Sequence, residues 1–128
     1  MPLETLLVLV KAHPAIQFVS LQKQLTPAER KQLGQFQNIL ILDKELKDFD
    51  ETAAVIRNLD LMITIDSVLL HLAGALATPA WGLLAYCPEW RWLIGRKDSP
   101  WYPGIKLFTQ AVAGDWASLA KRLFRQLK

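Results

Sequence analysis

The stretch from residue 61 to residue 76 constrains the fold more than any other part of the chain. It begins with the apolar and β-branched run Leu61-Met-Ile-Thr-Ile65, which predicts a short buried strand. The polar pair Asp66-Ser67 ends this run, and an apolar segment with a single His and a single Gly follows as a helix. A buried strand that leads directly into a helix is typical of an α/β unit with a parallel sheet. The backbone N–H groups and the positive dipole end at the start of such a helix favour an anion, so we expect a phosphate-bearing ligand there.

The alternation of strand and helix extends along the whole chain. Strands are predicted at 16–21, 38–42, 61–65, 80–85 and 105–109, and helices at 2–11, 27–33, 51–59, 67–76 and 115–127. The second helix has a clear start signal, with Thr26 as N-cap, Pro27 at the first position and Glu29 at the third. Alternating elements indicate an α/β three-layer sandwich, in which a mostly parallel sheet of about five strands is flanked by helices. Ligands of such sheets bind outside the carboxyl ends of the strands.

The composition excludes several classes of protein. A chain of 128 residues with 52% hydrophobic residues is not disordered, and we expect one domain over residues 1–128. The net charge of +3 comes without a long Lys/Arg run, so it fits phosphate binding better than nucleic-acid binding. The single cysteine, Cys87, rules out an intramolecular disulfide and a multi-cysteine metal site, and a reducing, cytoplasmic compartment is expected. Residues 68–87 carry no formal charge, but Thr78-Pro79 divides them into a buried helix and a buried strand rather than a membrane span.

The candidate binding residues lie at the predicted carboxyl ends of the strands. Ser67 and His71 are four residues apart and share a helix face, where they could bind phosphate or a sugar hydroxyl. The alternative is that Ser67 only caps the helix and His71 only belongs to the core. Lys23 follows a strand and could neutralise a phosphate, although such a lysine is often simply solvated. Thr52 could contact a ligand or cap its helix, and Arg91 could bind phosphate within a tryptophan-rich loop whose rings either line the cleft or close a small core.

Several common sites are missing from the sequence. It contains no Gly-x-Gly-x-x-Gly pattern, no Walker Gly-Lys-Ser/Thr pattern and no Gly-x-Ser-x-Gly elbow. An ordinary dinucleotide site, a P-loop and a serine-hydrolase site are therefore not expected.

Five segments in order resemble a known family. They are Phe18-Val-Ser-Leu-Gln-Lys23, Asp48-Phe-Asp-Glu-Thr-Ala-Ala54, Leu59-Asp-Leu-Met-Ile-Thr-Ile-Asp-Ser67, His71-Leu-Ala-Gly-Ala-Leu76, and Trp90-Arg-Trp92 with Ser99-Pro-Trp-Tyr-Pro103. Together they resemble the C-terminal half of bacterial glycosyltransferases that often carry tetratricopeptide repeats, which are similar to O-linked N-acetylglucosamine transferases and, more distantly, to heptosyltransferases. The resemblance implies a metal-independent GT-B glycosyltransferase whose Rossmann-like C-terminal domain binds a nucleotide-diphosphate sugar of the UDP or ADP type, without another cofactor.

The same resemblance implies a role for each candidate residue. Gln22 and Lys23 would approach the diphosphate, and the backbone of Asp66, Ser67 and Val68 would surround it. His71 would lie near the ribose or the diphosphate. Thr52 would be a lesser contact, and Arg91 would be a second phosphate counter-charge.

Two positions depart from the pattern of the heptosyltransferases. Val68 and Ala77 stand where that family has glycine. The resemblance also implies that the first strand of the donor domain and the whole acceptor domain lie outside these residues. The five strands would then close in the order 2-1-3-4-5, or another chain would fill the gap.

The function expected from these features is nucleotide-sugar binding in a glycosyltransferase, with the catalytic base outside residues 1–128 and the isolated chain inactive. A separate acceptor-domain or tetratricopeptide-repeat chain is a possible partner. The alternative is a noncatalytic module, a relic or regulatory domain, that binds a nucleotide or a protein. Nucleic-acid binding is a more remote alternative.

Overall fold

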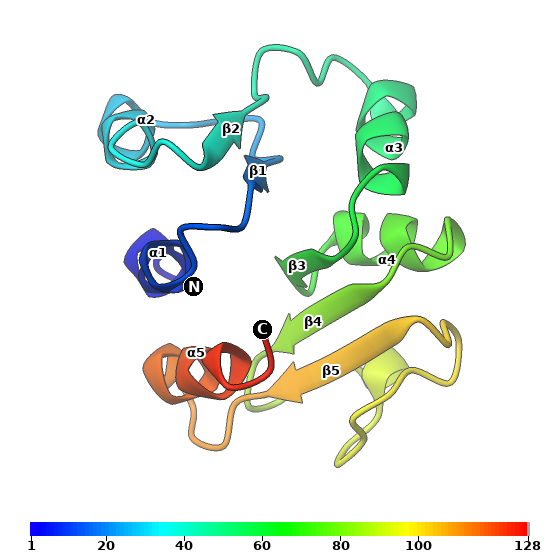
Figure 1. Ribbon diagram of the computed structural model, residues 1–128. Helices are drawn as coiled ribbons and strands as arrows, with labels where there is room; N and C mark the ends of the chain where they lie inside the picture. The colour runs from blue at the N-terminus through cyan, green and yellow to red at the C-terminus, as the bar shows by residue number, and fades with distance from the viewer. Residues whose placement is uncertain (128) are drawn as a thin grey trace. The chain divides into compact units, whose positions relative to one another are not determined.

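The computed structural model describes residues 1–127, which divide into two units, 1–52 and 53–127. The strands and helices alternate along both units in the order expected from the sequence (Figure 1).

The first unit contains α1 (Leu3–Ala12), β1 (Phe18–Ser20), α2 (Pro27–Leu33), β2 (Ile39–Ile41) and the start of α3 (Phe49–Arg57). The two strands pair in parallel, with Phe18 opposite Ile39. The predicted capping box of α2 is confirmed, because the Glu29 N–H donates to Thr26 Oγ1 while the Thr26 N–H donates to the Glu29 carboxylate. Buried apolar side chains of this unit are Leu9, Val10, Leu33 and Leu46.

The second unit contains the rest of α3 and a three-stranded parallel sheet. Its elements are β3 (Met62–Ile65), α4 (Val68–Ala75), β4 (Ala80–Leu84), the 3₁₀ helix η1 (Trp90–Trp92), β5 (Ile105–Thr109) and α5 (Trp116–Phe124). The central strand is β4, which lies between β3 and β5 (Figure 1). Four of its five residues are buried, because the strand is paired on both sides and covered on both faces.

One face of this sheet contacts α4, and the other contacts the segment that follows α5. On one face, Leu70 of α4 packs so closely on Gly82 of β4 that a Cβ at position 82 would lie 2.7 Å from Leu70 Cδ2. On the other face, Lys106 bonds to Gln126, which follows α5. The face assignments follow from the alternation of side chains along β4 and β5.

The mixed α/β class and the parallel pairing of strands are confirmed. The described residues form two small sheets, β1-β2 and β3-β4-β5, so one sheet of about five strands in the order 2-1-3-4-5 is not confirmed. The single domain over residues 1–128 also stays a prediction.

Several predicted boundaries were too wide. The first strand begins at Phe18 rather than Ile16, because Ile16 donates its N–H to the His13 carbonyl and so belongs to a turn. The last helix ends at Phe124 rather than Leu127. The loop from 86 to 103 contains η1, which the sequence did not predict.

The uncharged stretch 68–87 forms α4 and β4, as expected. Across residues 1–127, none of the helices combines the length and the apolar character that crossing a bilayer requires.

Candidate functional site

An open hollow of about 560 Å³ lies where β3 leads into α4. Its lining residues are Asp66, Ser67, Val68, His71, Glu89 and Arg91. The structure therefore brings together five of the residues singled out from the sequence and adds Glu89. The hollow belongs entirely to the second unit, whereas Gln22, Lys23 and Thr52 belong to the first.

Ser67 occupies the N-cap position of α4 without capping it. Its backbone is extended, with φ −156° and ψ 170°, and its side chain makes no capping hydrogen bond. The hydroxyl lies 3.3 Å from Thr64 Oγ1 instead. The first N–H groups of a helix generally have no partner within the helix. In α4 the Leu70 N–H donates to the Ser67 carbonyl at 3.1 Å, so the N–H groups of Val68 and Leu69 are the candidate donors to an anion in the hollow.

His71 is held by two aromatic side chains. Its imidazole stacks on the Trp92 indole with ring centroids 5.0 Å apart and an interplanar angle of 25°. Its Nδ1 lies 3.3 Å from the Tyr102 hydroxyl. These contacts fix the ring plane and engage Nδ1, which leaves Nε2 as the nitrogen that can bond to a ligand.

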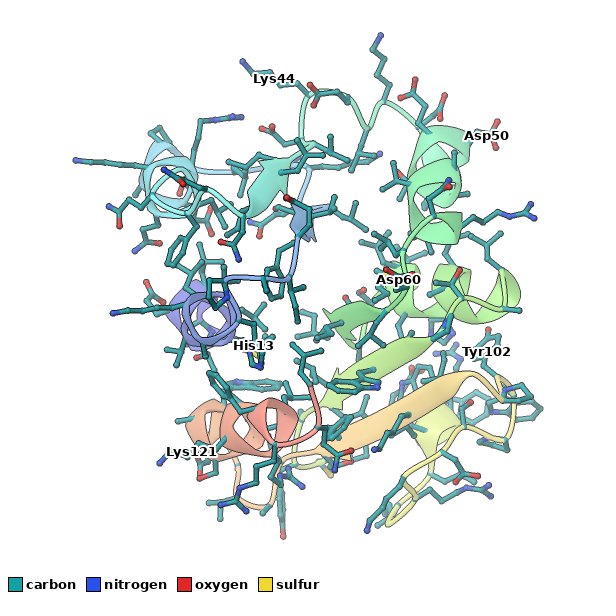
Figure 2. All side chains as sticks on the ribbon, viewed as in Figure 1. His13, Lys44, Asp50, Asp60, Tyr102 and Lys121 are labelled. Atoms are coloured by element: carbon teal, nitrogen blue, oxygen red, sulfur yellow. The ribbon has the colours of Figure 1, made fainter. Side chains whose placement is uncertain are left out.

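Tyr102 is held in turn by residues on both sides. A Cβ at position 74 would lie 2.4 Å from Tyr102 Cγ, so the ring of Tyr102 contacts the backbone of α4 at a glycine. The buried hydroxyl of Ser99 accepts hydrogen bonds from the N–H groups of Trp101 and Tyr102 at 3.2 and 3.1 Å. Tyr102 lies in the loop before β5, beside α4 (Figure 2). Nothing in the sequence indicated the contact between Tyr102 and His71.

The charges around the hollow are mixed. Arg91 is its single cation among the lining residues, beside the carboxylates of Asp66 and Glu89. The Arg91 guanidinium forms an ion pair with Glu89 and lies 5.1 Å from the centre of the Trp90 ring. An anion in the hollow would therefore compete with Glu89 for Arg91.

The candidate residues of the first unit have separate surroundings. Gln22 is exposed and donates to the Gln24 carbonyl. The exposed Lys23 ammonium lies 5.9 Å from the centre of the Phe49 ring. Thr52 is 1% exposed, and its hydroxyl donates to the Asp48 carbonyl at 2.9 Å within the first turn of α3.

The tryptophans of the 86–103 loop divide between core and surface. Trp92 is fully buried, whereas Trp90 and Trp101 are 68% and 61% exposed. The two exposed rings belong to a second hollow of about 470 Å³, which shares His71 and Arg91 with the first. Its lining residues are His71, Trp90, Arg91, Trp101 and Tyr102.

The described residues contain no group of three or more His, Cys, Asp or Glu that could hold a metal ion. The pair Asp48 and Asp50 has Asp-x-Asp spacing, but Asp48 accepts from the Glu51 N–H at 2.9 Å and so acts at the start of α3.

Comparison with known proteins places most of the chain in one family. The sequence profile of glycosyltransferase family 9 (heptosyltransferase) matches residues 16–108, which include β1 to β4, all of β5 except Thr109, and the residues of both hollows. The chain belongs to glycosyltransferase family 9.

This family 9 chain is also similar to Protein FlbA of Caulobacter vibrioides, with 32% identity over 81 residues. The matched segment covers 63% of this chain, and the chain spans only 13% of the length of that protein. No solved structure matches this chain.

Proposed function

We propose that this chain is the donor-binding part of a glycosyltransferase, and that the hollow at the start of α4 binds the diphosphate of a nucleotide sugar. The observation that carries the proposal is the convergence of Ser67, His71 and Arg91 on one hollow at a helix N-terminus. A diphosphate is favoured there by the helix dipole and by charge-assisted hydrogen bonds. Membership of family 9 supports a ligand of this class.

Each lining group has a distinct task in the proposal. The N–H groups of the first turn of α4 bond to one phosphate, with Val68 presenting backbone rather than side chain. Arg91 leaves Glu89 to pair with the other phosphate, and His71 Nε2 bonds to an oxygen of phosphate or ribose. These cationic and dipolar groups can stabilise the leaving diphosphate without a metal ion.

Other parts of the proposal rest on the resemblance. Gln22 and Lys23 are proposed as further diphosphate contacts of a UDP- or ADP-type donor. Thr52 acts indirectly, because its hydroxyl is buried and bonded within α3. The GT-B architecture, the association with tetratricopeptide repeats, and a catalytic base outside these residues belong to the same proposal.

The test is an NMR titration of the ¹⁵N-labelled chain with UDP, ADP, GDP and UDP-N-acetylglucosamine. Binding should shift the signals of Ser67, Val68 and His71. The Arg91→Ala variant should bind about tenfold more weakly, as expected for the loss of one charge-assisted hydrogen bond. Lys121→Ala is the matched control, because it removes one exposed cation from α5 and should leave the affinity unchanged.

Two results would separate the alternatives. The absence of shifts at millimolar nucleotide would contradict a donor site in this chain. Nucleotide binding without sugar transfer or donor hydrolysis, even with an acceptor domain added, would favour the noncatalytic module.

A further inference from the structure

The second hollow is lined by aromatic side chains, and two of them, Trp90 and Trp101, are largely exposed to solvent. We propose that Trp90, Trp101 and Tyr102 form a subsite for a pyranose ring, next to the diphosphate hollow. This inference rests on the proposed function and adds the binding of a sugar ring to the binding of the diphosphate. The ring would come from the donor sugar or from a saccharide acceptor.

The two exposed indoles are held in place although they face solvent. The Trp101 Nε1–H donates to the Arg91 carbonyl at 3.0 Å, which fixes the edge of that ring. The Arg91 guanidinium lies over the Trp90 ring, with 5.1 Å between its central carbon and the centre of the ring. Exposed large aromatic rings that converge on a hollow mark an interaction site more often than isolated exposed residues do.

The chemistry of the lining suits a pyranose. The C–H groups on one face of the sugar ring form an apolar surface that can stack on an indole, and its hydroxyls project from the ring edge. Arg91, His71 and Tyr102 supply polar groups at the margin of the same hollow. An apolar platform with a few polar groups around it is the usual construction of a small-molecule site.

The position of the hollow favours a sugar over a nucleobase. Both hollows include His71 and Arg91, so a group in the aromatic hollow lies next to the proposed diphosphate. The group bonded directly to the diphosphate of a nucleotide sugar is a sugar at either end. The nucleobase lies one ring further away, beyond the ribose.

The experiment follows the indole N–H signals of the five tryptophans by NMR. The ligands are UDP and ADP, their glucose, galactose, mannose and N-acetylglucosamine derivatives, and the methyl glycosides of the same sugars. A donor sugar in the subsite should shift the Trp90 and Trp101 signals with a nucleotide sugar but not with the free nucleotide. An acceptor sugar should shift them with a methyl glycoside alone. The signals of Trp81 and Trp116, which line neither hollow, should stay in place.

Variants extend the test to affinity. Trp90→Ala and Trp101→Ala should each weaken binding of the sugar ligand about three- to tenfold, with a change of less than about twofold for the free nucleotide. Ile94→Ala is the matched control, because Ile94 is an 88% exposed apolar residue of the same loop that lines neither hollow. It should bind like the unaltered chain.

The failures of the two proposals can be distinguished. If free nucleotide shifts Trp90 and Trp101 as strongly as nucleotide sugar does, the hollow holds the ribose or the base of the nucleotide and the pyranose inference is wrong. If no sugar ligand shifts them while Ser67 and His71 respond to nucleotide, the inference fails and the donor site stands. If sugar ligands shift Trp90 and Trp101 but no nucleotide perturbs Ser67 or His71, the subsite stands and the diphosphate proposal fails. If no ligand shifts any of the four residues, both proposals fail.

Discussion

At the residue scale, Ala77 has a backbone conformation that usually belongs to glycine. It follows the end of α4 with φ 54°, in the left-handed region. An L-residue there is disfavoured by about 1–2 kcal/mol because its Cβ crowds the carbonyl. Ala77 is one of the two positions where the sequence has another residue in place of the glycine of the heptosyltransferase pattern, and the left-handed conformation is present without a glycine.

We predict that Ala77→Gly stabilises the protein by about 0.5–1 kcal/mol in urea unfolding. Relief of the left-handed strain outweighs the greater freedom that glycine gives the unfolded chain, which is about 0.4–1 kcal/mol. The matched control is Ala54→Gly, an exposed position inside α3, where the same change should destabilise by about 1 kcal/mol. Equal effects of the two variants would contradict the prediction.

A second residue-scale prediction concerns Glu89. Its carboxylate pairs with Arg91 and lines the diphosphate hollow, so it opposes an anion both by repulsion and by holding the cation. We predict that Glu89→Gln tightens binding of UDP or ADP about two- to fivefold, a modest effect because the pair is exposed to solvent. Isothermal titration calorimetry measures it, and Asp98→Asn, which breaks the exposed Arg96–Asp98 pair, is the control. Weaker binding by Glu89→Gln would show that Glu89 itself contacts the ligand.

At the scale of single elements, the capping box of α2 makes the stability of the start of this helix depend on pH. The hydrogen bond from the Thr26 N–H holds the pKa of the Glu29 carboxyl below its usual value, and the Thr26 hydroxyl acts in the same direction. Since the pKa is lower in the folded state, this carboxylate stabilises the fold above its unfolded-state pKa. The contribution is lost as the pH falls through the folded-state pKa.

We predict that Thr26→Ala raises the pKa of Glu29 toward its usual value. The measurement is the ¹³C shift of the carboxyl carbon as a function of pH. Asp98 provides an internal control, because its pKa is lowered by Arg96 and should not respond to the change at Thr26. An unchanged Glu29 titration would mean that the Thr26 hydroxyl does not contribute to this pKa, because the variant keeps the N–H of residue 26, whose hydrogen bond is the larger cause.

The packing of α4 against the loop before β5 depends on Gly74. We predict that Gly74→Ala destabilises the protein by about 1–3 kcal/mol, because the added methyl group overlaps the Tyr102 ring. It should also move the indole signal of Trp92, whose ring stacks on His71. Gly104→Ala is the matched control, since its Cβ would meet the Thr78 carbonyl oxygen at 3.8 Å, an ordinary contact. Similar losses of stability in both variants would contradict this account.

At the scale of the whole molecule, the two units differ in how well their sheets are buried. The strands β1 and β2 have three residues each and no fully buried residue, whereas β4 is buried at four of five positions. Short two-stranded pairings are marginal in water. We predict that amide hydrogens of β4, such as that of Leu83, exchange slowest with deuterated water and those of β1 and β2 at least about tenfold faster. Equal protection of both sheets, measured by NMR, would contradict this ranking.

The sequence predicted much of the local structure and part of the site. The start of α2 could be predicted because a capping box involves residues only three positions apart. The β3–α4 unit could be predicted because its apolar run ends at Asp66-Ser67. The structure places Ser67, His71 and Arg91 around one hollow, and their role as ligand contacts stays a prediction. Tyr102 was missed because it reaches His71 from 31 residues away, and no local pattern encodes that contact.

What the sequence by itself determined is the order of the α-helices and strands, the mixed α/β class with parallel strands, and the relation to glycosyltransferases, whereas the closer resemblance to the tetratricopeptide-repeat and O-linked N-acetylglucosamine transferases is not confirmed. These follow from hydrophobic periodicity, caps and short motifs, which act between residues close together in the chain. Only the tertiary structure decided that the strands pair as β1-β2 and β3-β4-β5. Only the tertiary structure decided that Trp92 is buried while Trp90 and Trp101 line a hollow. The physical reason is that strand pairing and side-chain burial depend on contacts between distant segments, which an apolar or aromatic residue permits but does not specify.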